Sequence, residues 1–320
     1  MVSLRALFAA MTPAFLGINA ISQLELQPRD SPTQRCGAAY QGLKCTAMGT
    51  VNLCCSQYGW CGDSPGHCGG GCQAAYGKCG SGSVPSTRPL LGMVPYGFNI
   101  YTCTTPGTIA MTYDDGPYLW TSQLLDILDY HGIKATFFVT ANNHGKGPLN
   151  DPARPWVALL KRMYASGHQI AGHTMDHPDL NTLSESDRRA QMTELEVRLK
   201  EIIGCYPTYM RPPFSSCGAA CMSTMKDLGY HVVLFDLDTD DYNNPTPALI
   251  QRSKDIVTAT IKGADPRYRG FISIAHDPVY QTVYNLTGHQ IAVGSSAGFR
   301  FVTLGECLGD PSSNWYRTEL

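Results

Sequence analysis

The sequence is poor in charged residues, has no excess of basic residues and lacks a long apolar run. Charged residues make up 16% of the 320 residues, and 24 lysines and arginines against 26 aspartates and glutamates give a formal net charge of −2. Proteins that bind nucleic acid carry a basic patch or stripe, so nucleic acid is not an expected partner. The apolar stretch 7–20 is too short to span a bilayer and residues 314–320 are polar, so no membrane anchor is expected.

The N-terminal residues have the pattern of a secretory signal. Arg5 supplies the positive charge, residues 7–20 supply a short apolar stretch, and Ala20 is suited to cleavage. We therefore expect residues 1–20 to be a signal peptide and the mature protein to be secreted, extracellular or in a cell wall. The 13 cysteines agree with this destination, because disulfides persist in oxidising compartments.

Eight of the cysteines are crowded into residues 36–79. A segment this short cannot bury enough apolar surface to fold on hydrophobicity alone, so we expect disulfides to hold it together. Many pairings of eight cysteines are open in principle. The residues 80–96 that follow begin with Gly and Ser and continue with Pro, which is the composition of a linker between two domains.

The segment 36–79 resembles the hevein-like chitin-binding modules. The resemblance rests on the cysteine spacing and on the run CCSQYGWCG at 54–62. It implies four disulfides, which are Cys36–Cys55, Cys45–Cys61, Cys54–Cys68 and Cys72–Cys79.

Within this module we expect four residues to bind chitin. Ser56, Tyr58 and Trp60 alternate around a tight turn, which places the two rings on one side, where sugar faces can stack on them. The hydroxyl of Ser56 can bind an N-acetyl carbonyl. His67 stands where the family usually carries a third aromatic residue. The alternative is that the two rings form only a small core.

After the linker, strand-like and helix-like segments alternate. Strands are expected at 107–113, 133–139, 168–171, 208–210, 231–235 and 270–275, and helices at 124–128, 156–165, 184–203 and 248–261. In the clearest helix, Ser184 and Asp187 form a capping box and Gly204 ends the helix. This alternation predicts an α/β fold, a distorted and incomplete (β/α) barrel of about seven units.

Polar residues cluster at the ends of five of the strand-like runs. The clusters are TYDDGP at 112–117, HTMDHP at 173–178, RPPF at 211–214, DTDDY at 238–242 and IAHD at 274–277. Parallel folds carry their chemistry at the carboxyl ends of the strands, so we expect the five clusters to meet on one face.

Two of these clusters contain a candidate metal site. His173 and His177 have three residues between them and can reach one ion, and Asp115 supplies a carboxylate from another strand end. This donor set leaves positions open for water and substrate and suits Zn²⁺, with Co²⁺ or Mn²⁺ as alternatives. A metalloprotease of the H-E-x-x-H kind is disfavoured, because Thr174 stands where the glutamate base is needed.

The five clusters, in this order, resemble those of the NodB-homology polysaccharide deacetylases, carbohydrate esterase family four, over residues 97–310. The resemblance implies that Asp115, His173 and His177 bind the metal. It implies that Asp114 is the general base, held by Arg211, and that the backbone N–H of Phe214 stabilises the oxyanion.

The same resemblance assigns the residues on the leaving-group side. It implies that His276 is the general acid, which Asp241 orients and whose pKa Asp241 raises. Ile274, Tyr242 and Pro213 are expected to contact the substrate. The family commonly has Trp where this sequence has Tyr242, and often Tyr in place of Phe214.

Together, the two resemblances imply a monomeric enzyme of the secreted fungal chitin deacetylase type. It would hydrolyse the N-acetyl groups of N-acetylglucosamine residues in chitin and give chitosan and acetate. One alternative is a deacetylase of the same fold that acts on xylan or peptidoglycan, because a binding module does not fix the active-site substrate. Another is an inactive lectin that coats chitin, whose mark would be a missing ligand, base or acid.

Five cysteines lie outside the module. We expect Cys103 to bridge Cys307 and Cys217 to bridge Cys221, which leaves Cys205 without a partner. The sequence contains one N-glycosylation sequon, at 285–287. Four other histidines show no partner pattern and are expected to be structural or on the surface; these are His144, His168, His231 and His289.

Overall fold

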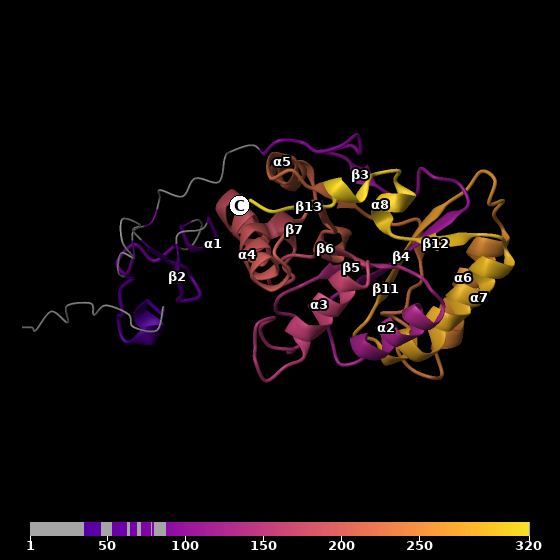
Figure 1. The fold of residues 1–320 in the computed structure, drawn as a ribbon, viewed down its shortest axis with the longest axis horizontal. Helices are drawn as coiled ribbons and strands as arrows, with labels where there is room; N and C mark the ends of the chain where they lie inside the picture. Colours follow the sequence, from indigo (N-terminus) through magenta and orange to yellow (C-terminus); the bar gives the residue numbers. More distant parts are fainter. Residues whose placement is uncertain are drawn as a thin grey trace, which may run out of the picture.

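The computed structural model describes residues 35–45, 53–62, 65–68, 72–77, 79 and 88–319. A small cysteine-rich module lies beside a larger α/β domain (Figure 1). The expected signal peptide, residues 1–20, and residues 80–87 of the expected linker lie outside the described residues.

The module contains little regular structure. It has the 3₁₀ helix η1 (Ala38–Tyr40), the antiparallel strands β1 (Cys54–Cys55) and β2 (Cys61–Gly62), and the short helix α1 (Pro65–Cys68). Its cysteines form the four pairs that the hevein-like resemblance implies. The larger domain contains the pairs Cys103–Cys307 and Cys217–Cys221, and Cys205 is buried and free.

A parallel sheet of nine strands forms the centre of the larger domain. The strands are β3 (Asn99–Ile100), β4 (Thr108–Asp114), β5 (Thr136–Val139), β6 (Gln169–Gly172), β8 (Tyr209–Met210), β9 (His231–Val233), β10 (Leu237–Asp238), β11 (Phe271–His276) and β12 (Arg300–Val302). Their order is β10-β11-β4-β5-β6-β8-β9-β3, and β12 also pairs with β4. The pairing of β4 with β11 sets Asp114 opposite His276 at the carboxyl ends of both strands.

The sheet curls into a half-barrel. The segment between β9 and β10 connects the two ends of the sheet. Leu234 N donates to Ile100 O of β3 at 2.7 Å, and Asp236 N donates to Ile272 O of β11 at 3.1 Å. The predicted distorted, incomplete α/β barrel is therefore confirmed.

Helices cover the outside of this sheet (Figure 1). They are α2 (Thr121–Tyr130), α3 (Trp156–Ala165), α4 (Glu185–Ile203), α5 (Ala219–Asp227), α6 (Ile250–Lys262), α7 (Thr287–Ser296) and α8 (Leu304–Cys307). Ser184 caps α4 by accepting from Asp187 N at 3.2 Å, and Gly204 ends it with φ 80°, as its sequence predicts. Shorter elements are η2 (Leu180–Thr182), η3 (Pro213–Ser215), the π-helical turn η4 (Thr282–Leu286), η5 (Ser312–Asn314), and the antiparallel pair β7 (Tyr206–Pro207) and β13 (Tyr316–Arg317).

Alternation along the strands decides which side chains point toward the site. One face of β4 packs against α2 and α3 through Ile109, Met111 and Tyr113. Ala110 lies on the other face and belongs to the cluster inside the barrel. Because side chains alternate between faces, Asp114 shares the inner face with Ala110. In β11, Ile272 packs on that same face, which places Ile274 and His276 there as well.

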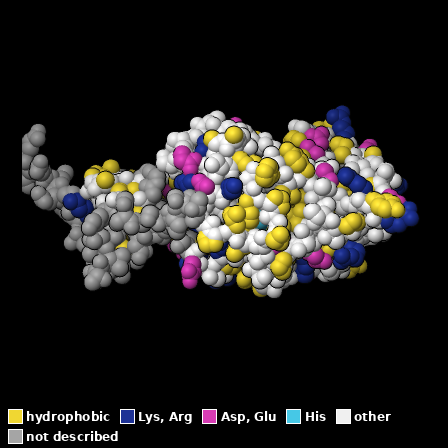
Figure 2. All heavy atoms as spheres, turned by 90° about the horizontal axis from the view of Figure 1, so that it is seen from above, with side chains coloured by type: hydrophobic (Ala, Val, Ile, Leu, Met, Phe, Trp, Pro, Cys, Tyr) yellow, Lys and Arg dark blue, Asp and Glu magenta, His cyan; other side chains and the backbone are white. Residues whose placement is uncertain are grey.

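Charged side chains of both signs are interspersed on the face shown in Figure 2, where hydrophobic side chains gather toward the middle. Among the described residues, no helix is both long and apolar enough to cross a membrane.

Candidate active site

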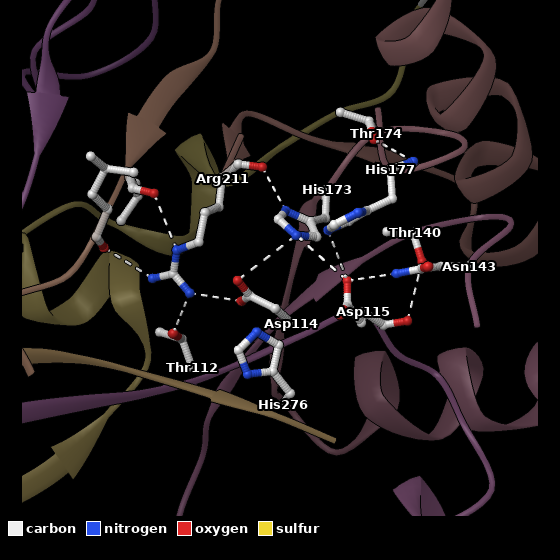
Figure 3. A network of polar contacts seen from close by, with 12 residues as sticks. Thr112, Asp114, Asp115, Thr140, Asn143, His173, Thr174, His177, Arg211 and His276 are labelled. Atoms are coloured by element: carbon white, nitrogen blue, oxygen red, sulfur yellow. Dashed lines mark hydrogen bonds and ion pairs between the residues drawn. The ribbon is translucent and has the colours of Figure 1, made fainter. Parts of the chain in front are cut away.

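Asp115, His173 and His177 come together at the carboxyl ends of β4 and β6 (Figure 3). Nε2 of His177 lies 3.3 Å and Nε2 of His173 lies 3.7 Å from Oδ1 of Asp115. One ligand atom from each of the three residues lies within 4.8 Å of the others. Two imidazoles and one carboxylate at this spacing fit a divalent cation with positions left for water and substrate.

The two histidines are held with their Nε2 atoms toward this point. Nδ1 of His173 lies 2.6 Å from the carbonyl oxygen of Arg211, to which it donates. His177 lies in a turn in which its backbone N donates to Thr174 Oγ1 at 3.0 Å. The ring hydrogen bond of His173 fixes its tautomer and orientation, whereas the backbone hydrogen bond of His177 fixes only the turn that carries it.

Backbone conformation also marks the site. Asp115, Thr174 and His177 have φ values of 77°, 71° and 58°, in the left-handed region that non-glycine residues rarely adopt. Such conformations persist only where the surrounding structure enforces them, and they cluster at functional sites.

Two residues that the sequence analysis did not assign hold Asp115 in place. Asn143 Nδ2 donates to Asp115 Oδ1 at 2.8 Å, and His144 Nε2 lies 3.0 Å from Asp115 Oδ2. His144 is exposed, in agreement with the expectation from the sequence, but its contact with Asp115 places it beside the candidate metal site, a position that the sequence analysis did not assign. A signal was present, because the polar run 142–145 follows the strand β5, as the five recognised clusters follow theirs.

Arg211 and Asp114 form a buried ion pair beside these residues. Arg211 Nη1 donates to Asp114 Oδ1 at 2.7 Å, and both residues are only 1% exposed. The guanidinium also donates to Thr112 Oγ1 at 2.7 Å and to the carbonyl oxygens of Val233 and Leu234 at 3.2 and 3.0 Å. Asp114 Oδ2 points away from the arginine and lies 3.9 Å from His173 Nε2.

His276 approaches Asp114 from the side opposite His173 and His177 (Figure 3). The fully buried Asp241 holds it, since one carboxylate oxygen lies 2.7 Å from His276 Nδ1 and the other accepts from His276 N at 2.7 Å. Thr282 donates a further hydrogen bond to Asp241.

Three pKa shifts follow from this arrangement. Burial would raise the pKa of Asp115, but the hydrogen bond with His144 and the nearby histidines outweigh it and hold that pKa well below its usual range. Burial, followed by the neighbouring His173, lowers the pKa of His177 to about 4. Burial opposes protonation of His276, but the charge of Asp241 and its hydrogen bond raise the pKa of His276 to about 9. Neutral His177 can donate a lone pair to a metal, and charged His276 can give up a proton.

These residues open into a cavity of about 700 Å³. Phe214, Tyr242 and Ile274, three of the expected substrate and oxyanion residues, line it. Pro213 is buried and is not among the lining residues, whereas Pro212 is.

Three of the expected chitin-binding residues of the module contact other groups of the protein. Ser56 is 4% exposed, and its Oγ accepts from Trp60 N at 3.2 Å. The guanidinium of Arg35 lies over the ring of Trp60, 3.2 Å from its centroid. The hydroxyl of Tyr58 donates to Asp176 Oδ2 at 2.8 Å, in the loop next to His177. His67, in α1, is partly buried.

Two family models match the chain. Residues 101–233 match the model described as polysaccharide deacetylase, and residues 35–79 match the model described as chitin recognition protein. The two matches fall on the two parts that the structure separates.

Individual proteins similar to this chain include chitin deacetylases. The chain is 43% identical over 237 residues to a chitin deacetylase of Colletotrichum lindemuthianum, an alignment that covers 74% of this chain and 94% of that protein. It is 41% identical to a chitin deacetylase of Pestalotiopsis sp, over 75% of this chain and 76% of that protein. The solved structure of the Colletotrichum lindemuthianum enzyme superposes with a TM-score of 0.68 over 71% of this chain and 98% of that chain.

Proposed function

Because this chain belongs to the polysaccharide deacetylase family, we propose that it hydrolyses the N-acetyl groups of N-acetylglucosamine residues in chitin and releases acetate, leaving chitosan. The observation that carries the proposal is the arrangement around Asp114. Arg211 fixes one of its oxygens, the candidate metal ligands lie beside the other, and His276 lies opposite them.

We assign the general base to Asp114. A divalent cation held by Asp115, His173 and His177 would polarise the acetyl carbonyl and lower the pKa of the attacking water. Arg211 occupies Oδ1 of Asp114 and so leaves Oδ2 to accept the proton of that water.

We assign the general acid to His276. Asp241 engages Nδ1, so Nε2 is the atom that gives its proton to the glucosamine nitrogen as the bond between carbon and nitrogen breaks. The backbone N–H of Phe214 is assigned to the developing oxyanion, and Ile274 and Tyr242 to the substrate wall.

The donor set supports Zn²⁺ as the metal, with Co²⁺ or Mn²⁺ as alternatives, because imidazole and carboxylate ligands suit all three. We also propose that residues 36–79 and 97–310 act as separate domains of a secreted, monomeric protein. Its six disulfides, Cys36–Cys55, Cys45–Cys61, Cys54–Cys68, Cys72–Cys79, Cys103–Cys307 and Cys217–Cys221, support an oxidising destination. The module would hold the polymer near the site and so raise the local substrate concentration.

Acetate release from N-acetylglucosamine tetramers and from acetylxylan tests the activity. The purified mature protein is treated with a chelator, resupplied with Zn²⁺, and compared with Asp114→Asn. We expect release from the chitin oligomer that depends on the metal and is abolished by Asp114→Asn. Release only from acetylxylan would overturn the substrate, and release from neither, with chitin binding intact, would overturn the enzymatic function in favour of a lectin.

A further inference from the structure

Three aromatic residues form a ledge beside the cavity, and no role has yet been given to them. Trp120 precedes α2, and Tyr280 and Tyr284 come after the loop that follows β11, the strand that ends at His276. The ring centroids of Tyr280 and Tyr284 lie 4.4 Å apart, and the ring of Trp120 lies 5.1 Å from that of Tyr280 and 6.2 Å from that of Tyr284. We call these three residues the aromatic ledge.

The ledge is continuous with the candidate active site. Tyr280 is one of the residues that line the cavity, and it follows His276 by four positions. Tyr284 lies four positions further on, one helical turn away, which continues the apolar surface away from the cavity. A bound polymer chain that extends beyond the cavity on this side would cross the ledge.

The two tyrosines are exposed in a way that core packing does not explain. Tyr280 is 46% and Tyr284 is 42% exposed, whereas Trp120 is partly buried and packs against the main core. Within residues 88–319, the hydroxyls of both tyrosines have no hydrogen-bond partner. Aromatic surface combined with unused polar groups suits a ligand that is apolar on its faces and polar at its edges.

We propose that the aromatic ledge is a binding subsite for a sugar ring of the polymer, adjacent to the residue that is deacetylated. A pyranose ring offers C–H faces to stack on the rings of Tyr280 and Tyr284 and hydroxyl groups to bond to their hydroxyls. This inference rests on the proposed function, because it takes the cavity to be the deacetylation site.

The dependence of activity on oligomer length tests the ledge. Acetate release from N-acetylglucosamine dimers and hexamers is measured for the full chain, Tyr284→Ala, Tyr284→Phe and the control Tyr130→Ala, which removes an 86% exposed tyrosine from α2. We expect Tyr284→Ala to lower kcat/KM for the hexamer about tenfold, equivalent to about 1.4 kcal/mol, mostly through KM, and to leave the dimer unchanged. Tyr284→Phe retains the ring and is expected to retain most of the hexamer activity.

Equal kcat/KM for the hexamer in wild type and Tyr284→Ala, or equal losses for dimer and hexamer, would overturn the subsite. Hexamer binding is measured in parallel by calorimetry. Every protein in this measurement also carries Trp60→Ala, which removes an expected sugar contact of the module, so that the heat reports binding to the larger domain. An inactive wild type that loses hexamer affinity on Tyr284→Ala would overturn the deacetylase function and leave the subsite. If the wild type is inactive and the hexamer affinity is the same with and without Tyr284→Ala, both the deacetylase function and the subsite would be overturned.

Discussion

The hydroxyl of Tyr58, in the small module, donates a 2.8 Å hydrogen bond to Oδ2 of Asp176, which stands immediately before His177 in the larger domain. Asp176 also accepts from Asn142 Nδ2 at 2.8 Å and from Gln191 Nε2 at 2.9 Å. A side chain expected to stack on a sugar is therefore part of a contact between the module and the loop that carries a candidate metal ligand.

Helix α4 also contributes to this contact. Its apolar stripe at 192–202 faces the core, yet Glu194 and Val197, on the opposite side, are only 5% and 7% exposed. Gln57 of the module donates to Glu194 Oε1 at 3.1 Å, and burial raises the pKa of Glu194 to about 8. A sugar stacked on Tyr58, as the sequence predicts, would therefore compete with the docked module for this side chain.

Removing only the hydroxyl of Tyr58 separates these two roles. Tyr58→Phe keeps the ring but loses the bond to Asp176, so we expect the affinity for chitin to rise about threefold to fivefold, because such a bond contributes about 1 kcal/mol. Tyr58→Ala loses the ring as well and is expected to bind more weakly than wild type. Binding isotherms on chitin beads measure both, and weaker binding by Tyr58→Phe would mean that the hydroxyl serves the sugar instead of the docked state.

The pair of Arg211 and Asp114 is expected to matter for both folding and activity. Arg211→Met leaves a buried carboxylate without its partner, so the free energy of unfolding should fall by about 3–5 kcal/mol. Arg211→Lys keeps the charge but loses the planar fork, and it should recover part of the stability while kcat stays about 100-fold below wild type. Urea unfolding and acetate release measure the two effects. Arg267→Met, which breaks an exposed pair with Asp265, is the control and should change neither.

The chemistry of the site is more predictable from the sequence than its surroundings are. Asp114 and His276 end two strands, and Asp115 follows the first of them. The alternation of segments implies that these strands pair in parallel, so the meeting point of the three residues follows from topology. The polar run 142–145 marks the end of β5, but the contact of His144 with Asp115 depends on a loop that turns back with φ 51° at His144 itself, and the sequence does not show that turn.

Other elements escaped prediction because tertiary packing determines them. Helix α7 contains two glycines and a serine pair, which have weak helix propensity, and it forms because residues such as Ile291 are buried against the core. Strand β12 is three residues long and is recognisable only by its pairing with β4. For Tyr58, the alternation of residues could not show that its hydroxyl bonds to Asp176 of the larger domain.

The raised pKa of His276 predicts the alkaline limit of activity. A general acid must start protonated, so activity should be retained below a pH of about 9 and fall as the pH rises through that value. Asp241→Asn removes the charge that favours the protonated imidazole and leaves the burial that opposes it, so the alkaline limb should move to lower pH, toward the ordinary value of 6.5. The pH profile of kcat/KM for both proteins measures the shift. A profile whose alkaline limb does not move would show that His276 is not the group that titrates.

His144 is expected to act on metal binding through Asp115. Its Nε2–H donates to Asp115 Oδ2 while Oδ1 faces the two candidate ligands, so losing this bond lets the carboxylate turn away from the position that the metal requires. We expect His144→Ala to weaken Zn²⁺ binding about 10-fold to 100-fold, the range seen when a residue that orients a metal ligand is removed, and His144→Gln to restore part of the loss through its amide donor. Competition titration with a chromophoric chelator measures the affinity without any turnover, and His131→Ala, at the exposed end of α2, is the matched control. Unchanged Zn²⁺ affinity in His144→Ala would assign this histidine to the cavity wall alone, where it could contact the substrate without supporting the metal site.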